Sequence, residues 1–185
     1  NEILHLDEIQ ILSPIIPSKI VCIGRNYAEH AKELGNEIPK EPLLFLKAPS
    51  AIIKNSDPII IPEQSQMVEH EGELGVIIGK DCCKLKDSEN PLDYILGFIA
   101  LNDVTARDLQ KKDIQFTRAK SFDTFCPISN LIETDLDFND ITIQTKVNGV
   151  IKQTGKTSQM VFPIPYLIRY ISHQMTLKKD RKSVV

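Results

Sequence analysis

The 185-residue sequence contains no tryptophan, and aromatic residues make up only 6% of it. Its formal net charge at pH 7 is −3, because 22 basic residues are nearly balanced by 25 acidic ones. A chain with neither a basic excess nor aromatic platforms is not typical of proteins that bind nucleic acid or an anionic membrane surface. We therefore expect neither nucleic acid nor membrane among its partners.

Long apolar runs and paired cysteine motifs are also missing. No run approaches the roughly 20 residues of a membrane span, and the N-terminal residues show no basic-then-apolar signal segment. None of the four cysteines belongs to a Cys-x-x-Cys pair, so a zinc site or a disulfide framework is not indicated. Reduced cysteines favour a cytoplasmic protein, or a mitochondrial one if the organism is eukaryotic.

The length suits a single domain over residues 1–185. Asn148-Gly149 separates two runs typical of strands and predicts a β-hairpin. Helices are expected over residues 27–34, just after Asp103, and over 163–175. Strands outnumber helices and the two do not alternate regularly, which predicts a strand-rich α+β fold. The expected strands are residues 20–24, 43–47, 73–78, 94–102, 141–147 and 150–152, with a short extended segment at 58–62.

Two glutamates, Glu71 and Glu73, lie one residue apart at the start of an apolar strand. Alternate side chains of a strand share a face, so the two carboxylates should lie about 7 Å apart on one side. Buried like charges are costly without a cation between them, and carboxylates are the ligands that Mg²⁺ prefers. The alternative is an edge strand whose glutamates face water, and the tripeptide alone does not decide between the two.

Asp103 supplies a third carboxylate at the end of the strand over residues 94–102. Functional side chains are often presented at such strand-to-helix junctions. Three carboxylates would suit an open Mg²⁺ site that leaves positions for water and a chelating substrate. Taken alone, Asp103 is more typical of a cap for the following helix.

Five short motifs occur in one order along the chain: Val21-Cys22-Ile23-Gly24-Arg25-Asn26-Tyr27, Phe45-Leu46-Lys47, Glu71-Gly72-Glu73-Leu74, Asn102-Asp103-Val104-Thr105-Ala106-Arg107-Asp108 and Ala119-Lys120-Ser121-Phe122-Asp123. With them the chain resembles the fumarylacetoacetate hydrolase family over residues 20–177, and most closely its small acylpyruvate hydrolase and oxaloacetate decarboxylase branch. The resemblance implies a mixed β-roll with short flanking helices and a homodimer. It also implies Mg²⁺ or Mn²⁺ on Glu71, Glu73 and Asp103.

The resemblance further implies a 2-oxo acid substrate that chelates the cation through its keto and carboxylate oxygens. Lys120 matches the active-site lysine, whose ammonium would stabilise the enolate left when a C–C bond breaks; as a lone lysine it is otherwise typical of the surface. Arg107 is equally suited to an ion pair with Asp103 or Asp108. The positions that match substrate-binding residues of the family are Arg25, Lys47, Arg107 and Gln110.

His30 and Glu33 lie three residues apart on the predicted helix after Asn26, and so on one of its faces. A carboxylate beside an imidazole fixes its tautomer and raises its basicity, so the pair could activate water. A surface histidine beside a solvated glutamate is the commoner case. The resemblance favours a catalytic dyad on a lid helix, which orients the water that attacks the acyl carbonyl.

The C-terminal residues depart from the family pattern. Relatives continue into a Gly-Asp strand and a Gly-Thr-Pro loop that holds the substrate carboxylate, and no Gly-Thr-Pro occurs in this sequence. We therefore expect a truncated C-terminus, which leaves a non-catalytic, metal-binding remnant as one alternative function. The other alternative is an isomerase or decarboxylase of 2-hydroxy-dienoate diacids.

Overall fold

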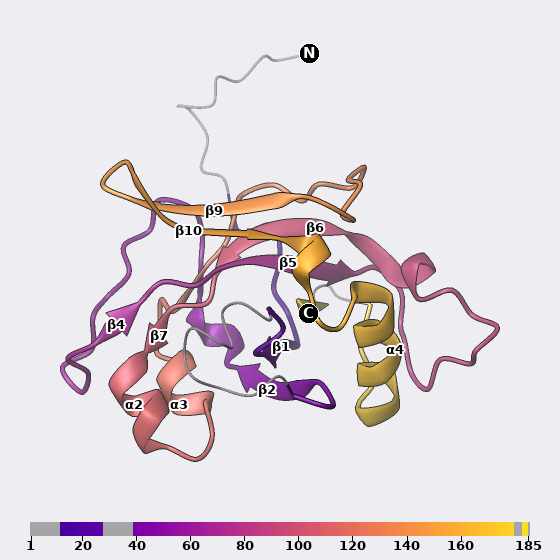
Figure 1. Cartoon of the computed structure of the whole chain (residues 1–185), viewed down its shortest axis with the longest axis horizontal. Helices are drawn as coiled ribbons and strands as arrows, with labels where there is room; N and C mark the ends of the chain where they lie inside the picture. Colours follow the sequence, from indigo (N-terminus) through magenta and orange to yellow (C-terminus); the bar gives the residue numbers. More distant parts are fainter. Residues whose placement is uncertain (1–11, 28–38, 180–182, 185) are drawn as a thin grey trace, which may run out of the picture.

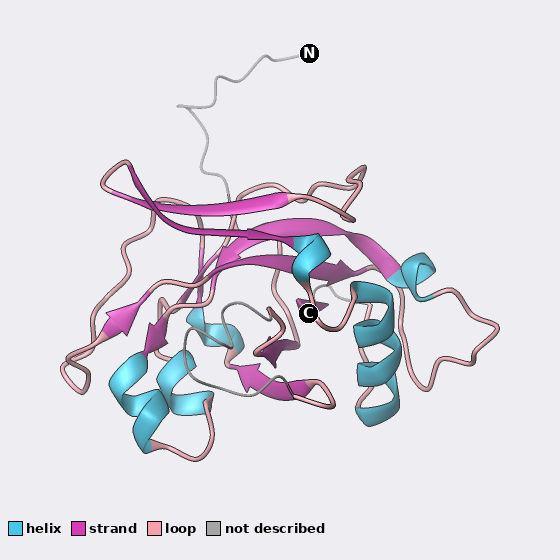
Figure 2. Ribbon diagram, viewed as in Figure 1, coloured by secondary structure: helices cyan, strands magenta, loops and turns pink. Residues whose placement is uncertain are grey.

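The computed structural model describes residues 12–27, 39–179 and 183–184. Its central sheet has the strand order β2-β1-β11-β5-β6 and is mixed, since β11 runs parallel to β1 while the other neighbours are antiparallel (Figure 2). This architecture confirms the predicted strand-rich α+β fold. The five strands are β1 (Lys19–Gly24), β2 (Leu43–Lys47), β5 (Gly72–Ile78), β6 (Ile95–Asn102) and β11 (Ser183–Val184).

The sheet is covered on both faces, and alternate side chains of β5 enter two different cores. Ile77 packs into a core with Ile20 and Ile99, whereas Val76 and Ile78 belong to a second core. The second core is completed by α4 (Ile164–Gln174), which lies at one end of the molecule (Figure 1). Each fully buried aliphatic side chain of this kind contributes about 1.5–3 kcal/mol.

The predicted hairpin is confirmed as β9 (Thr142–Val147) and β10 (Val150–Lys156), which lies over β5 and β6 (Figure 1). Asn148 and Gly149 have φ angles of 51° and 78°, the left-handed conformations that a type I′ turn requires. The hairpin approaches β5 so closely that a Cβ on Gly72 would lie 2.2 Å from the Thr145 hydroxyl oxygen. Glycine is therefore needed between the two glutamates.

The helix expected directly after Asp103 begins later than predicted. Thr105 and Ala106 form β7 (Thr105–Ala106), which pairs with β4 (Val68–Glu69), and α2 (Arg107–Lys112) starts only after this pairing ends. The N-cap position belongs to Ala106, so the alternative that Asp103 caps the helix is wrong. The next helix is α3 (Thr117–Lys120).

The remaining elements are short. The segment at residues 58–62 forms no strand, and Tyr94 belongs to a 3-10 turn rather than to the following strand. None of the helices described here has the length and apolarity needed to cross a membrane. These elements are the strand pair β3 (Ile52–Ile53) and β8 (Cys126–Pro127) and the 3-10 helices η2 (Pro49–Ala51), η3 (Pro91–Tyr94) and η4 (Thr157–Gln159).

Candidate active site

A cavity of about 360 Å³ lies between β1 and β5, with further walls from β2, α2, α3 and α4. Among the described residues, β11 pairs with β1 at Lys19 and Ile20 and with β5 at Ile77. One part of its lining is apolar, with side chains such as Val76 and Leu167, and another part is charged. The polar and charged lining contains eight of the ten residues predicted for the site: Arg25, Lys47, Glu71, Glu73, Asp103, Arg107, Gln110 and Lys120.

The backbone of the sheet brings Glu71 and Asp103 together. Gly72 pairs with Asn102 where β5 meets β6, and just beyond this pair the Asp103 amide donates to the Glu71 carbonyl at 2.8 Å. The Asn102 side chain accepts a hydrogen bond from the Glu71 amide at 2.9 Å. Residues that are 32 positions apart in sequence therefore carry their carboxylates side by side.

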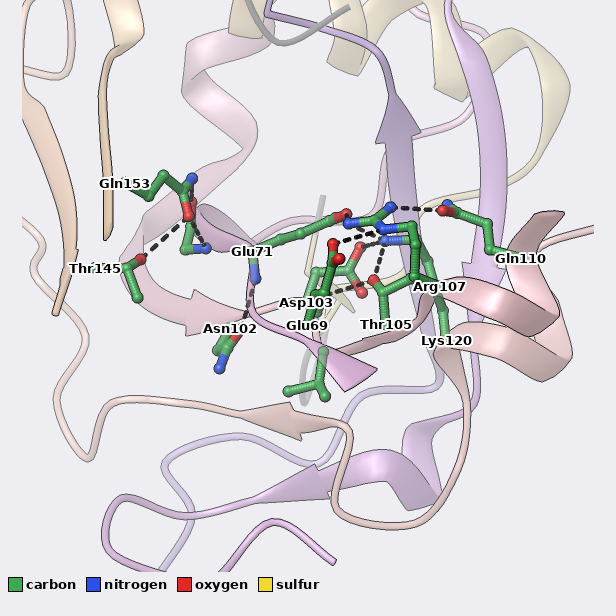
Figure 3. Close-up of polar contacts among 12 residues, drawn as sticks. Glu69, Glu71, Asn102, Asp103, Thr105, Arg107, Gln110, Lys120, Thr145 and Gln153 are labelled. Carbon is green, nitrogen blue, oxygen red and sulfur yellow. Dashed lines mark hydrogen bonds and ion pairs between the residues drawn. The ribbon is translucent and has the colours of Figure 1, made fainter. Parts of the chain in front are cut away.

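The Lys120 ammonium lies between these two carboxylates, at the end of α3. Its Nζ donates to Glu71 Oε2 at 2.7 Å, to Asp103 Oδ2 at 2.6 Å and to the Thr105 hydroxyl at 2.8 Å (Figure 3). The Lys120 side chain is only 3% exposed, so the alternative of a surface lysine is wrong. Burial lowers its pKa, but the charges of Asp103 and Glu71 outweigh burial and raise it, which keeps the lysine protonated.

Lys47 approaches Asp103 from the other side. Its Nζ lies 2.6 Å from Asp103 Oδ1 and also donates to the carbonyl groups of Val104 and Lys120, and its side chain is fully buried. These contacts hold Asp103 and the backbone of Lys120 in place. Contact between Lys47 and a substrate stays a prediction.

The guanidinium of Arg107 binds three side chains, each through a different nitrogen. It donates to Glu71 Oε1 at 2.6 Å, to Glu69 Oε2 at 2.8 Å and to the Gln110 side chain at 2.5 Å (Figure 3). The expected alternative of an ion pair with Asp103 or Asp108 is wrong, because β7 turns this side chain toward Glu69 and Glu71 instead. Burial raises the pKa of Glu71, but Lys120 and Arg107 outweigh burial, and the pKa falls below its usual value.

Glu73 differs from the other two acids because no hydrogen bond or ion pair with another described residue holds its carboxylate. Burial and the negative charges of Glu71 and Asp103 raise its pKa to about 8. The third acid thus lines the same cavity as the first two and lies close enough to feel their charges. An unpaired carboxyl with a raised pKa marks a position where one more positive charge would be favourable.

These residues fit a hard divalent cation by their chemistry. Among the described residues, no three acidic, histidine or cysteine side chains are gathered as a finished metal site. Lys120 lies between Glu71 and Asp103. That ammonium shows, however, that the two carboxylates share one cation position. Asp103 Oδ1 is already paired with Lys47, whereas no described residue forms a hydrogen bond or ion pair with Glu73, so the Glu73 carboxylate oxygens remain available as ligands. The expectation of water-facing glutamates on an edge strand is wrong, since Glu71 is only 15% exposed and paired.

Three of the predicted residues remain to be placed: Arg25, His30 and Glu33. Arg25 is exposed, lines the cavity and has a positive φ of 59°, an uncommon backbone conformation for a residue other than glycine. His30 and Glu33, with most of the predicted lid helix, lie outside the described residues. Their role stays a prediction.

Sequence reasoning missed several residues that support the cluster. The Thr105 hydroxyl accepts from Lys120 and donates to the Asp103 carbonyl. From the hairpin, the Gln153 side chain binds both the amide and the carbonyl of Gly72, at 2.8 and 2.9 Å (Figure 3). Thr105 lies within a motif that the sequence analysis quoted, whereas the position of Gln153 depends on the hairpin folding over β5 and has no local signal.

Fold and site together define a strand-rich enzyme-like domain with a carboxylate–lysine cluster in a cavity. The sequence pattern of the family "Fumarylacetoacetate (FAA) hydrolase C-terminal" matches residues 19–180. The chain belongs to the fumarylacetoacetate hydrolase family.

Named relatives and solved structures agree with this membership. The chain is 47% identical to a Dictyostelium discoideum protein named oxaloacetate decarboxylase, mitochondrial, over 86% of this chain and 76% of that protein. It is 40% identical to the Bos taurus oxaloacetate tautomerase FAHD1, mitochondrial, over 86% and 75%. The crystal structure of a 5-carboxymethyl-2-hydroxymuconate delta-isomerase from Mycobacterium smegmatis superposes with a TM-score of 0.86 at 42% identity, over 97% of this chain and 70% of that one.

Proposed function

We propose that the chain is a divalent-metal-dependent enzyme of small 2-oxo acids. Its main reaction is the hydrolysis of acylpyruvates (2,4-dioxo acids), and oxaloacetate decarboxylation is a related activity. The observation that carries the proposal is the Lys120 ammonium held between Glu71 and Asp103 on the wall of a cavity. The relatives named for oxaloacetate support the class of substrate.

Glu71, Glu73 and Asp103 would hold the ion, which we take to be Mg²⁺ or Mn²⁺. When bound, such an ion supplies a Lewis acid for the keto and carboxylate oxygens of a 2-oxo acid. Arg107 and Lys47 fix two of these carboxylates, so we assign both a positioning role in addition to the substrate contacts predicted for them. Arg25 and Gln110, which also line the cavity, are the remaining candidates for binding a substrate carboxylate.

Both reactions release the same leaving group, the pyruvate enolate. Hydrolysis adds water to the acyl carbonyl, breaks the C3–C4 bond and yields a carboxylate, pyruvate and a proton. Decarboxylation breaks the corresponding bond of oxaloacetate and releases CO₂, and C3 then takes up a proton. In each case the electron pair passes into the pyruvate enolate, whose negative charge the buried Lys120 ammonium would stabilise.

Hydrolysis alone needs an activated water, and we assign this task to His30 with Glu33 as its orienting partner. Replacing His30 with alanine should abolish acylpyruvate cleavage while oxaloacetate decarboxylation continues within a few-fold. Equal loss of both activities would contradict a water-activating role for His30. Comparing the two rates on one preparation makes the test independent of the amount of folded protein.

The second candidate is an isomerase or tautomerase, favoured by the names of the bovine protein and the mycobacterial structure. Tautomerisation moves a proton at C3 through the same enolate and breaks no C–C bond, so the cluster would serve it equally well. A non-catalytic, metal-binding remnant is the remaining alternative. We also propose one domain over residues 1–185, a homodimer, and a cytoplasmic location, or a mitochondrial one as in the relatives so named.

The proposal is tested by following acetylpyruvate cleavage, oxaloacetate decarboxylation and oxaloacetate enol–keto conversion with and without Mg²⁺. The chain and its Glu73→Ala variant should both fold, and only the former should turn over acetylpyruvate with Mg²⁺ present. Faster enol–keto conversion without C–C cleavage would favour the tautomerase. A folded, metal-binding chain without any of the three activities would favour the remnant.

A further inference from the structure

Gly72 separates the two glutamates of the proposed metal site, and glycine has the most permissive backbone of any residue. The Asn102 side chain accepts from the Glu71 amide and the Asp103 amide donates to the Glu71 carbonyl, so both backbone groups of this glutamate face the end of β6. Successive residues of a strand direct these groups to opposite edges, so the amide and carbonyl of Gly72 face away from β6. Their partner comes from outside the central sheet.

The Gln153 side chain, on β10, supplies that partner. Its Oε1 accepts from the Gly72 amide at 2.8 Å, and its Nε2 donates to the Gly72 carbonyl at 2.9 Å (Figure 3). A primary amide offers an acceptor and a donor side by side, so it replaces the hydrogen bonds that a neighbouring strand would form. The Thr145 hydroxyl donates to the same Oε1 at 3.2 Å, which helps to fix the orientation of the amide.

A β-bulge in the hairpin brings Gln153 to this position. Ile151 pairs with Lys146 and Gln153 pairs with Thr145, so Lys152 is an extra residue in the strand pairing. Without the extra residue, strand alternation would turn Gln153 to the exposed face of the hairpin. Bulges are typical of places where a side chain is re-aimed beside an active site.

The hairpin lies behind the wall that carries the two glutamates. A Cβ on Gly72 would point at the Thr145 hydroxyl, 2.2 Å away, so this face of β5 belongs to the hairpin. Side chains alternate along a strand, so Glu71 and Glu73 occupy the other face, and both line the cavity. Gln153 does not line the cavity, so its effect on the two carboxylates passes through the Gly72 backbone.

We propose that Gln153 is a positioning residue for the metal site: it fixes the Gly72 peptide and thereby directs the Glu71 and Glu73 carboxylates toward one divalent ion. The inference rests on the proposed function, because it takes the ion from there. Rotation of a glycine peptide between two ligand residues would turn their side chains apart, and two hydrogen bonds from one planar amide oppose that rotation. Groups that orient metal ligands typically contribute about 10- to 100-fold to metal affinity.

A purely structural role, in which Gln153 only attaches the hairpin to β5, makes a different prediction. Gln153→Met keeps the length of the side chain and removes both hydrogen bonds to Gly72. With a structural role alone, the variant loses stability, but the folded protein binds metal as before. With a positioning role, the folded variant binds metal more weakly.

The test titrates Mn²⁺ into the whole chain and follows the free ion by electron paramagnetic resonance, at a temperature where circular dichroism shows each variant to be folded. We expect Gln153→Met to weaken Mn²⁺ binding about 10- to 100-fold. The matched control is Gln144→Met, which alters an exposed glutamine of β9 and should leave the affinity within twofold. A second control, Ile171→Val, should lower the melting temperature through the core beneath α4 without changing the affinity.

Hydrogen exchange of the Gly72 amide, followed by NMR, tests the contact in the unchanged chain. Coupling between two sites is reciprocal, so a bound ion should strengthen the hydrogen bond that positions its ligands. We therefore expect Mg²⁺ to slow the exchange of this amide more than that of the amides in α4. This measurement decides the proposal even if Gln153→Met does not fold.

Mn²⁺ affinity of folded Gln153→Met within twofold of the unchanged chain would overturn the inference, as would Gly72 exchange that is indifferent to Mg²⁺. Failure of the proposed function has a separate signature. An unchanged chain that binds Mn²⁺ but turns over no 2-oxo acid contradicts the proposed chemistry, and the affinities of the variants still decide the role of Gln153. An unchanged chain that binds no Mn²⁺ contradicts both.

Discussion

Replacing Lys120 with methionine removes the central charge of the cluster while keeping the aliphatic volume of the side chain. Glu71, Asp103 and Thr105 each lose a hydrogen bond of 2.6–2.8 Å. Removing one partner of a buried ion pair costs about 3–5 kcal/mol. We therefore expect the free energy of unfolding of the metal-free variant to fall by about that amount, measured by urea denaturation with a chelator present.

The same change should strengthen the binding of a divalent cation. A unit charge about 4 Å away contributes about 4 kcal/mol at an effective dielectric constant of about 20. Loss of the competing ammonium should therefore tighten Mg²⁺ or Mn²⁺ binding at least tenfold in calorimetric titrations, and excess metal should recover part of the lost stability. Turnover should nevertheless fall at least about 100-fold, as when a group that stabilises an oxyanion is removed.

The matched control is Lys112→Met, which removes an exposed lysine at the end of α2. It should change the free energy of unfolding by less than about 0.5 kcal/mol. If replacing Lys120 changed stability no more than this control, Lys120 would not be the buried cation that stabilises the cluster. Parallel loss of metal affinity and turnover would equally contradict an ammonium that competes with the cation and stabilises the enolate.

Three further outcomes follow from particular contacts. Gly72→Ala should lower the free energy of unfolding by about 1–3 kcal/mol in urea denaturation, because its Cβ would collide with Thr145. Hydrogen bonds from Ser65 and the neighbouring backbone hold the pKa of Asp108 below its usual value. Its contribution to stability is therefore present above about pH 4 and is lost as pH falls through the lowered pKa, so Asp108→Asn should reduce the loss of stability in acid. Iodoacetamide should modify only Cys83 in the native chain, since burial raises the pKa of the other three cysteines, and mass spectrometry of digested protein would show this.

Much of the strand pattern could be predicted because it depends on local signals. Apolar runs predicted β1, β2 and β5 to within a residue or so, and Asn148-Gly149 predicted the hairpin with its left-handed turn. The helix after Asp103 was placed too early. There the tertiary pairing of β7 with β4 overrides the local helix signal of Thr105 and Ala106.

For the site, the sequence indicated the residue types but not how they pair. The doublet Glu71 and Glu73 left a shared cation and water-facing side chains as alternatives. The structure supplies Lys120 and Arg107 for Glu71, whereas none of the residues it describes pairs with Glu73. For Arg107, sequence proximity suggests Asp103 or Asp108 as alternative partners, and the structure pairs it with Glu69 and Glu71 instead. Side-chain partners set by strand register and by hairpin docking have no signal in a local window.

The proposed function requires that three carboxylates share one divalent cation beside the cavity. Electron paramagnetic resonance of Mn²⁺, titrated with the unchanged chain and with the variants Glu71→Gln, Glu73→Gln and Asp103→Asn, tests this directly. We expect one bound ion per chain, an affinity at least tenfold lower in each variant, and a spectrum that changes when oxalate is added. Unchanged affinity in all three variants, or a Mn²⁺ spectrum indifferent to oxalate, would contradict the proposed site.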